Sequence, residues 1–147
     1  MDRGTAVLLT AFTGGLVALQ APINSLLGRS IGTWQAAFLS FAIGTLALAC
    51  IAALATGGLG QVADVRGVPW YYLTGGLLGA LYVTSILVTV RTLGAGGVTA
   101  ATITGQLTMS VIVDQFGWLG VDKDPVNGPK ILGLVLLALG TILIVRG

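Results

Sequence analysis

Four polar side chains recur at every fourth position of one apolar stretch, and their types could bind a solute or an ion. They are Thr102, Gln106, Ser110 and Asp114. Residues four apart share a helix face, so this spacing predicts one polar stripe about three turns long, with Gln106 near its midpoint. Polar groups at membrane depth usually face the protein interior or a water-filled cavity. We therefore expect Gln106 and Ser110 to contact a substrate.

Asp114 is the only acid that falls inside an apolar stretch. One interpretation is a carboxylate that couples transport to a bound proton or cation. The other is an interfacial carboxylate that pairs with Lys123 or caps the following loop. The sequence leaves both open.

A second polar cluster contains Gln20, Pro22 and Asn24. Gln20 and Asn24 share a helix face. Pro22 removes a backbone donor and clashes with the carbonyl of Ala18, which predicts a kink over residues 18–22. The two amides are candidate substrate-binding residues, or they form hydrogen bonds between helices.

A third group combines Gly75 and Gly79 with Tyr82. Glycines four apart allow two membrane helices to approach closely. Tyr82 falls mid-membrane, where its hydroxyl needs a partner. It is a further candidate for substrate contact, with packing as the alternative.

The sequence lacks the residues that several kinds of catalytic and binding sites require. The chain has no His and no Glu, and its one cysteine, Cys50, excludes a disulfide within the chain. A hydrolase needs a His base, and an aspartyl dyad needs two acids at one site. The basic residues are scattered and the net charge is only +2. We therefore predict no enzyme, no catalytic residue, no metal, no cofactor and no nucleic-acid partner.

The elements that carry these residues are membrane helices. Only 8% of residues are charged and the mean hydropathy is +0.98, whereas a soluble domain carries about 25% charged residues. A helix needs roughly 20 apolar residues to cross the bilayer. We predict a single all-α domain over 1–147 with five spans, at about 5–27, 33–55, 70–90, 98–118 and 131–145, separated by Gly28-Arg29-Ser30, a polar loop at 56–69, a glycine-rich turn at 93–97 and a polar loop at 121–130. The first span exceeds twenty residues, so we expect a retained helix and not a cleaved signal peptide.

Five crossings place the basic residues four against three on the two sides of the bilayer. Orientation follows the bias of Lys and Arg in short loops, and here that bias is one residue. A single orientation with the N-terminus inside is one interpretation. The other is an antiparallel dimer, either a homodimer or a heterodimer with an oppositely oriented homologous chain. Asn24 of one chain would then share a membrane depth with Asp114 of the other.

Three strings in order resemble a known family: Gln20-x-Pro22-x-Asn24-x-x-Leu27-Gly28, the segment 70–82 with its glycines, and Gly105-Gln106-x-x-x-Ser110-x-x-x-Asp114-x-Phe116-Gly117. The chain resembles the YdcZ-type family of small bacterial inner-membrane proteins in the drug/metabolite transporter superfamily. The resemblance covers essentially the full length. It implies a multi-pass inner-membrane protein that forms one half of an inverted-repeat transporter.

The four-helix relatives in that superfamily form antiparallel dimers around a Glu in the first helix. This chain has no Glu, so that acid and its proton coupling do not carry over to it. The expected function is a secondary transporter subunit that exports an unidentified small metabolite or drug-like solute through a dimer-interface cavity. The alternative is a membrane scaffold or regulatory subunit that pairs with a homologous chain and transports nothing.

Overall fold

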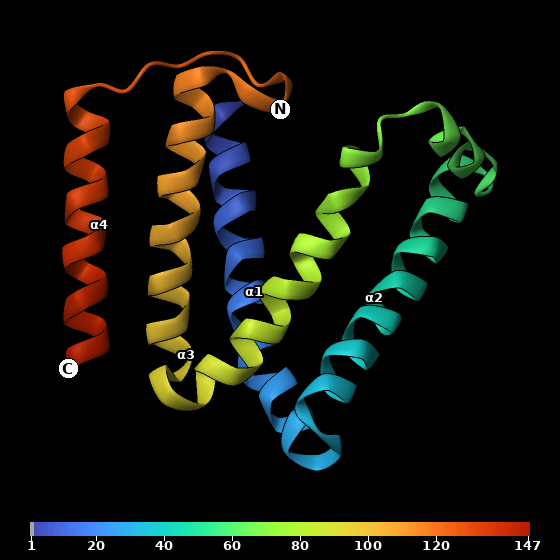
Figure 1. Ribbon diagram of the computed structural model, residues 1–147, viewed down its shortest axis with the longest axis horizontal. Coiled ribbons are helices and arrows are strands. Elements are labelled where there is room, and N and C mark those ends of the chain that lie inside the picture. The colour runs from blue at the N-terminus through green and yellow to red at the C-terminus, as the bar shows by residue number, and fades with distance from the viewer. Residues whose placement is uncertain (1) are drawn as a thin grey trace. The chain divides into compact units, whose positions relative to one another are not determined.

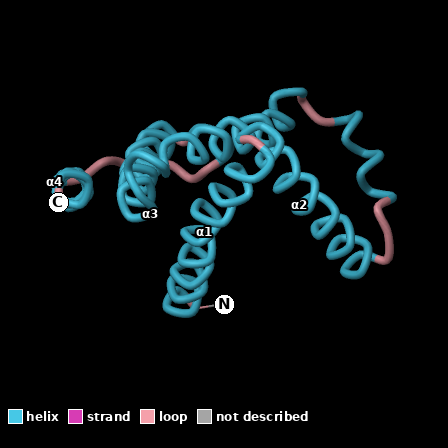
Figure 2. The backbone as a smooth tube through the Cα atoms, turned by 90° about the horizontal axis from the view of Figure 1, so that it is seen from below, coloured by secondary structure: helices cyan, strands magenta, loops and turns pink. Residues whose placement is uncertain are grey.

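The computed structural model describes residues 2–147, and every regular element in that range is helical (Figures 1 and 2). The α-helices are α1 Arg3–Ile31, α2 Thr33–Thr56, α3 Thr74–Phe116 and α4 Gly128–Arg146, and the short 3₁₀ helices are η1 Gly60–Gly67, η2 Trp70–Leu73 and η3 Trp118–Gly120. All four α-helices are long and apolar enough to cross a membrane. The all-α membrane class is thus confirmed.

Helix α3 contains two of the five predicted spans. As one straight helix its 43 residues would extend about 65 Å, twice a hydrocarbon core of about 30 Å. Its backbone leaves the helical region at Gly94, with φ 68° and ψ 171°, a conformation that glycine reaches because it has no Cβ. The segments 74–93 and 95–116 that flank Gly94 each have about 20 residues, enough for one crossing.

The predicted turn at 93–97 is therefore too long. Gly96 and Gly97 are helical and face α4, where an added Cβ would lie 3.9 Å from Ile144 Cγ2 and 3.5 Å from Val145 Cγ2 respectively. These two glycines permit close packing of helices and do not break one.

The chain divides into two compact units, Met1–Arg91 and Thr92–Gly147. The first unit contains α1, α2 and the part of α3 up to Arg91. Its core cluster consists of Ala36 and Ala37 from α2 and Val83 and Leu87 from α3, with Leu27 and Tyr82 packed against it. Leu87 is fully buried. Small alanines at this point let α3 approach α2.

The predicted break at Gly28-Arg29-Ser30 is wrong. Helix α1 runs through Pro22 and on to Ile31, and the chain turns at the single residue Gly32, with φ 97°. Gly28 remains helical because it is a packing position. A Cβ there would lie 3.1 Å from Arg91 Nη2 and 3.2 Å from Leu87 Cδ2.

The other helix ends lie close to their predicted positions. Helix α2 matches its predicted span to within a residue, and α4 begins at Gly128, where Asn127 Oδ1 accepts a 3.0 Å hydrogen bond from Lys130 N. At the start of α1, the side chain and backbone N–H of Thr5 donate to the Asp2 carboxylate. These bonds hold the pKa of Asp2 below its ordinary value, the side-chain bond contributing most.

Candidate functional site

The two candidate amides on α1 differ in how exposed they are. Gln20 is exposed, whereas Asn24 keeps only 7% of its surface and the adjacent Ser25 keeps 6%. Within residues 2–147 no side-chain hydrogen bond engages the Asn24 amide, and no fully enclosed side-chain polar atom lacks a partner. The amide of Asn24 therefore borders open space. An amide in such a position inside a membrane needs a polar neighbour, because an unpaired polar group in hydrocarbon is costly.

Tyr82 lies on the first segment of α3 and is half-buried. Its ring packs against the core cluster shared by α2 and α3. The structure thus provides the packing contact that was one of the two interpretations of this residue. Contact between its hydroxyl and a solute stays a prediction.

The predicted polar stripe is present as continuous helix on the second segment of α3. Gln106 and Ser110 are exposed, and Thr102 and Asp114 are half-buried. A residue two positions along a helix points about 200° away, so Gln106 and Thr104 lie on nearly opposite sides of α3. Thr104 contacts Thr141 of α4, so the side opposite Gln106 faces α4.

The side of α3 that faces α4 carries a polar contact that the sequence analysis missed. Thr104 Oγ1 and Thr141 Oγ1 are 2.6 Å apart, and Thr141 Oγ1 also donates to Ala100 O at 3.1 Å. Thr141 is one of few polar residues in the last span. A lone hydroxyl in an apolar helix is the sequence feature that could have indicated this contact. The two hydroxyls are hydrogen-bonded to each other and to Ala100 O, so this polar contact between helices does not need water.

Replacing Thr141 by Val should lower the free energy of unfolding by about 0.6 kcal/mol, the average for hydrogen bonds between membrane helices. The change removes both bonds of the Thr141 hydroxyl while keeping the side-chain shape. Detergent-induced unfolding in mixed micelles measures the loss. Thr108→Val is the matched control, because Thr108 donates only to Thr104 O of its own helix. Equal losses in the two variants would show that the contact between helices contributes nothing.

Asp114 lies in the last turn of α3 and anchors the following loop through its backbone. Its carbonyl oxygen accepts hydrogen bonds from Gly117 N at 3.3 Å and from Asp124 N at 2.9 Å. Gln115 Oε1 accepts a further bond from Val126 N at 2.6 Å. The connection from α3 to α4 is thus fixed without the Asp114 carboxylate.

The ion pair considered between Asp114 and Lys123 is absent from residues 2–147. Lys130 instead pairs with Asp124, Nζ to Oδ1 at 2.7 Å. The half-buried Asp114 carboxylate has no side-chain hydrogen bond in the same range. It lies at the end of α3 where the helix dipole is negative, so a bound cation would be stabilised there. Over that range no group of three or more His, Cys, Asp or Glu side chains could hold a metal ion.

Comparison with known protein families identifies one that matches this sequence. The profile of the family described as "Putative inner membrane exporter, YdcZ" matches residues 5–143. No curated protein and no solved structure matches the chain significantly. The matched region includes α2 and α3, nearly all of α1 and α4, and all the candidate site residues. The chain belongs to this YdcZ-type family of inner-membrane exporters.

Proposed function

We propose that the chain is one subunit of a secondary transporter that exports a small metabolite or drug-like solute. The observation that carries this proposal is the polar face of α3 at Gln106 and Ser110, which is exposed in the structure. A side chain with amide or hydroxyl groups facing lipid is costly, so such a face needs water, a solute or another protein surface. The opposite side of the same helix already pairs its hydroxyls with α4.

The chemistry of these faces favours one class of solute. Amides from Gln20, Asn24 and Gln106, with hydroxyls from Tyr82 and Ser110, offer hydrogen bonds without fixed charge. Faces of this kind suit a polar neutral or weakly charged solute better than a multivalent ion. In this proposal the Asp114 carboxylate binds the coupling proton or cation.

The cavity, as proposed, forms at the interface with a second, oppositely oriented homologous chain. The near-equal division of basic residues and the odd number of crossings support this arrangement. Inverted units generate a midplane site and two equivalent access routes. The partner is either a second copy or a homologue.

Reconstitution in liposomes that contain the pH dye pyranine tests the transport function. The external probes are neutral sugars, zwitterionic amino acids and tetraphenylphosphonium, each added under a pH gradient. We expect at least one probe to change the internal pH faster than in protein-free liposomes. Gln106→Leu should slow this flux about tenfold, as the loss of ~1.4 kcal/mol of solute binding would do.

Thr108→Val is the matched control because its hydroxyl lies off the stripe and should leave the flux unchanged. Equal flux in Gln106→Leu and the wild type would contradict a solute path along this face. Absence of flux for every probe class would favour the scaffold function over transport.

A further inference from the structure

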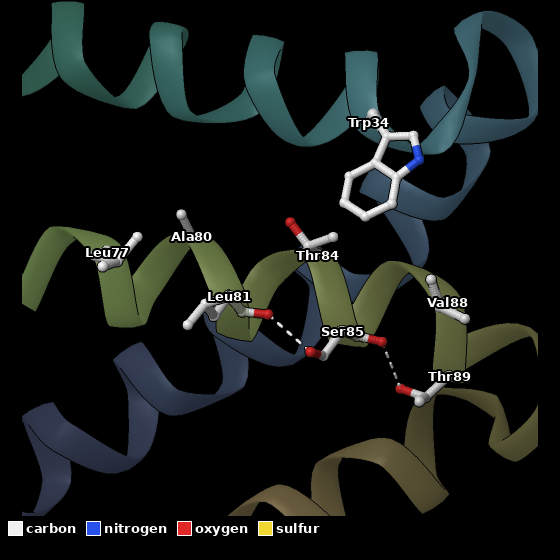
Figure 3. Close-up of a pocket in the computed structure, with 8 residues that line it drawn as sticks. All are labelled: Trp34, Leu77, Ala80, Leu81, Thr84, Ser85, Val88 and Thr89. Carbon is white, nitrogen blue, oxygen red and sulfur yellow. Dashed lines mark hydrogen bonds between the residues drawn. The ribbon is translucent and has the colours of Figure 1, made fainter.

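The first unit contains a groove of about 510 Å³ between α2 and the first segment of α3. Its lining residues are Trp34, Leu77, Ala80, Leu81, Thr84, Ser85, Val88 and Thr89 (Figure 3). From Leu77 to Thr89 the groove follows α3 for about 18 Å, at 1.5 Å per residue. Half of a hydrocarbon core is about 15 Å deep. The length of the groove is therefore close to the hydrocarbon thickness of one lipid leaflet.

The groove is more apolar than its residue types suggest. Ser85 Oγ donates to Leu81 O at 2.8 Å, and Thr89 Oγ1 donates to Ser85 O at 3.0 Å (Figure 3). Both hydroxyls thus bond to carbonyls of their own helix. Apart from the Thr84 hydroxyl, the surface they leave consists mainly of methyl and methylene groups, which favours a hydrocarbon chain over a polar solute.

A positive charge lies at one end of this groove. Arg91 follows Thr89 by two residues, and its Nη2 donates to Thr33 Oγ1 at 3.1 Å, next to Trp34. Arg29 lies in the last turn of α1, beside Gly28, which the Arg91 guanidinium overlies. Both arginines are exposed. The guanidinium of Arg91 keeps further N–H donors for another ligand.

No carboxylate of the first unit neutralises these arginines. Its acids are Asp2 and Asp64. Asp2 is about 39 Å along α1 from Gly28, and Asp64 lies beyond the far end of α2, which is itself about 35 Å long. The ion pair formed within residues 2–147 is between Lys130 and Asp124. Within the first unit the two arginines therefore have no acidic partner, and an anion from outside the chain would complement them.

We propose that an anionic phospholipid binds here, with an acyl chain in the groove and its phosphate on Arg91 and Arg29. Arginine binds phosphate oxygens through paired N–H donors. A zwitterionic headgroup carries its own cation and gains less from two uncompensated arginines. This site does not depend on the proposed transport function, because it lies within one unit and holds a structural lipid.

The test uses Trp34 as a reporter, since its indole lines the groove and is 72% exposed. Trp70 and Trp118 are replaced by Phe, so that only Trp34 fluoresces. Mixed bilayers contain phosphatidylglycerol or phosphatidylcholine with brominated acyl chains, which quench an indole on contact. We expect phosphatidylglycerol to be preferred about 25-fold at Trp34, about fivefold for each of the two arginines near the lipid surface.

Arg91→Gln should lower this preference about fivefold and the loss of both arginines should bring it close to one, whereas Arg66→Gln in η1 should leave it unchanged. Thr33→Val removes the hydrogen-bond partner of Arg91 and keeps the arginine's charge. The preference for phosphatidylglycerol should therefore persist, which would distinguish lipid binding by Arg91 from a structural role of its hydrogen bond to Thr33. If Arg91→Gln does not fold, Arg29→Gln gives the same test at an exposed position. Ala80→Phe should fill the groove and reduce quenching by both lipids.

Three results would overturn the proposal. The first is equal quenching by the two brominated lipids in the parent protein. The second is an unchanged preference after loss of both arginines. The third is a Trp34 that neither lipid quenches, which would show that another protein surface covers the groove.

Discussion

Replacing Asp114 by Asn is expected to abolish the coupling between the pH gradient and solute flux while downhill flux continues. The substitution keeps the shape of the side chain and removes the charge that binds a proton or cation. The structure leaves this carboxylate half-buried and gives it no ion pair in residues 2–147. Its backbone carbonyl, which anchors the loop before α4, is retained in the variant. The fold should therefore persist.

Proteoliposomes with internal pyranine measure this effect for any probe that the wild type transports. We expect the pH-driven component of flux to fall at least tenfold, which corresponds to ~1.4 kcal/mol of lost coupling. Asp64→Asn is the matched control, because Asp64 lies in η1 outside the membrane helices. Full pH-coupled flux in Asp114→Asn would exclude this residue as the coupling site.

Replacing Gly28 by Leu is expected to destabilise the first unit by about 1–3 kcal/mol, the usual cost of overpacking. The first added atom, Cβ, would lie 3.2 Å from Leu87 Cδ2 and 3.7 Å from Ala36 Cβ. Leu87 is fully buried and has little room to move. The Arg91 guanidinium, 3.1 Å from the same Cβ position, would also have to shift and would lose Thr33.

Thermal unfolding in detergent, compared with the wild type, measures this loss. Gly14→Leu makes the same change on the same helix, where a Cβ would meet nothing within 4 Å. It should be neutral or slightly stabilising, because leucine favours the helix over glycine by somewhat less than about 1 kcal/mol. A Gly28→Leu variant as stable as Gly14→Leu would refute the close contact between α1 and α3.

The sequence predicts the helices well because hydrophobic length decides them. Apolar runs of about 20 residues have few alternatives in a bilayer, and α2 and α4 agree closely with their predicted spans. Glycines account for the errors. Gly28 and Gly97 resemble helix breakers in the sequence but are packing positions, whereas the nearby Gly32 and Gly94 have positive φ values, as do four other glycines. Composition alone cannot distinguish these roles, because both follow from the missing Cβ.

The candidate site is predictable to a lesser degree. Helical periodicity correctly predicts that Gln106, Ser110 and Asp114 form one stripe on a helix. It does not predict that Lys130 pairs with Asp124, since the loop conformation selects the partner. It also misses the Thr104–Thr141 contact, which depends on how α4 is placed against α3. Contacts between residues 37 apart need tertiary structure.

Disulfide crosslinking between two differently tagged chains tests whether this subunit works with an oppositely oriented partner. Both chains carry Cys50→Ser, one carries Asn24→Cys and the other carries Asp114→Cys. In an antiparallel pair these positions share a membrane depth, so a crosslink should form between the two tags and not between chains that carry the same substitution. Crosslinks only between like positions, 24 with 24 or 114 with 114, would show parallel chains and exclude the antiparallel dimer.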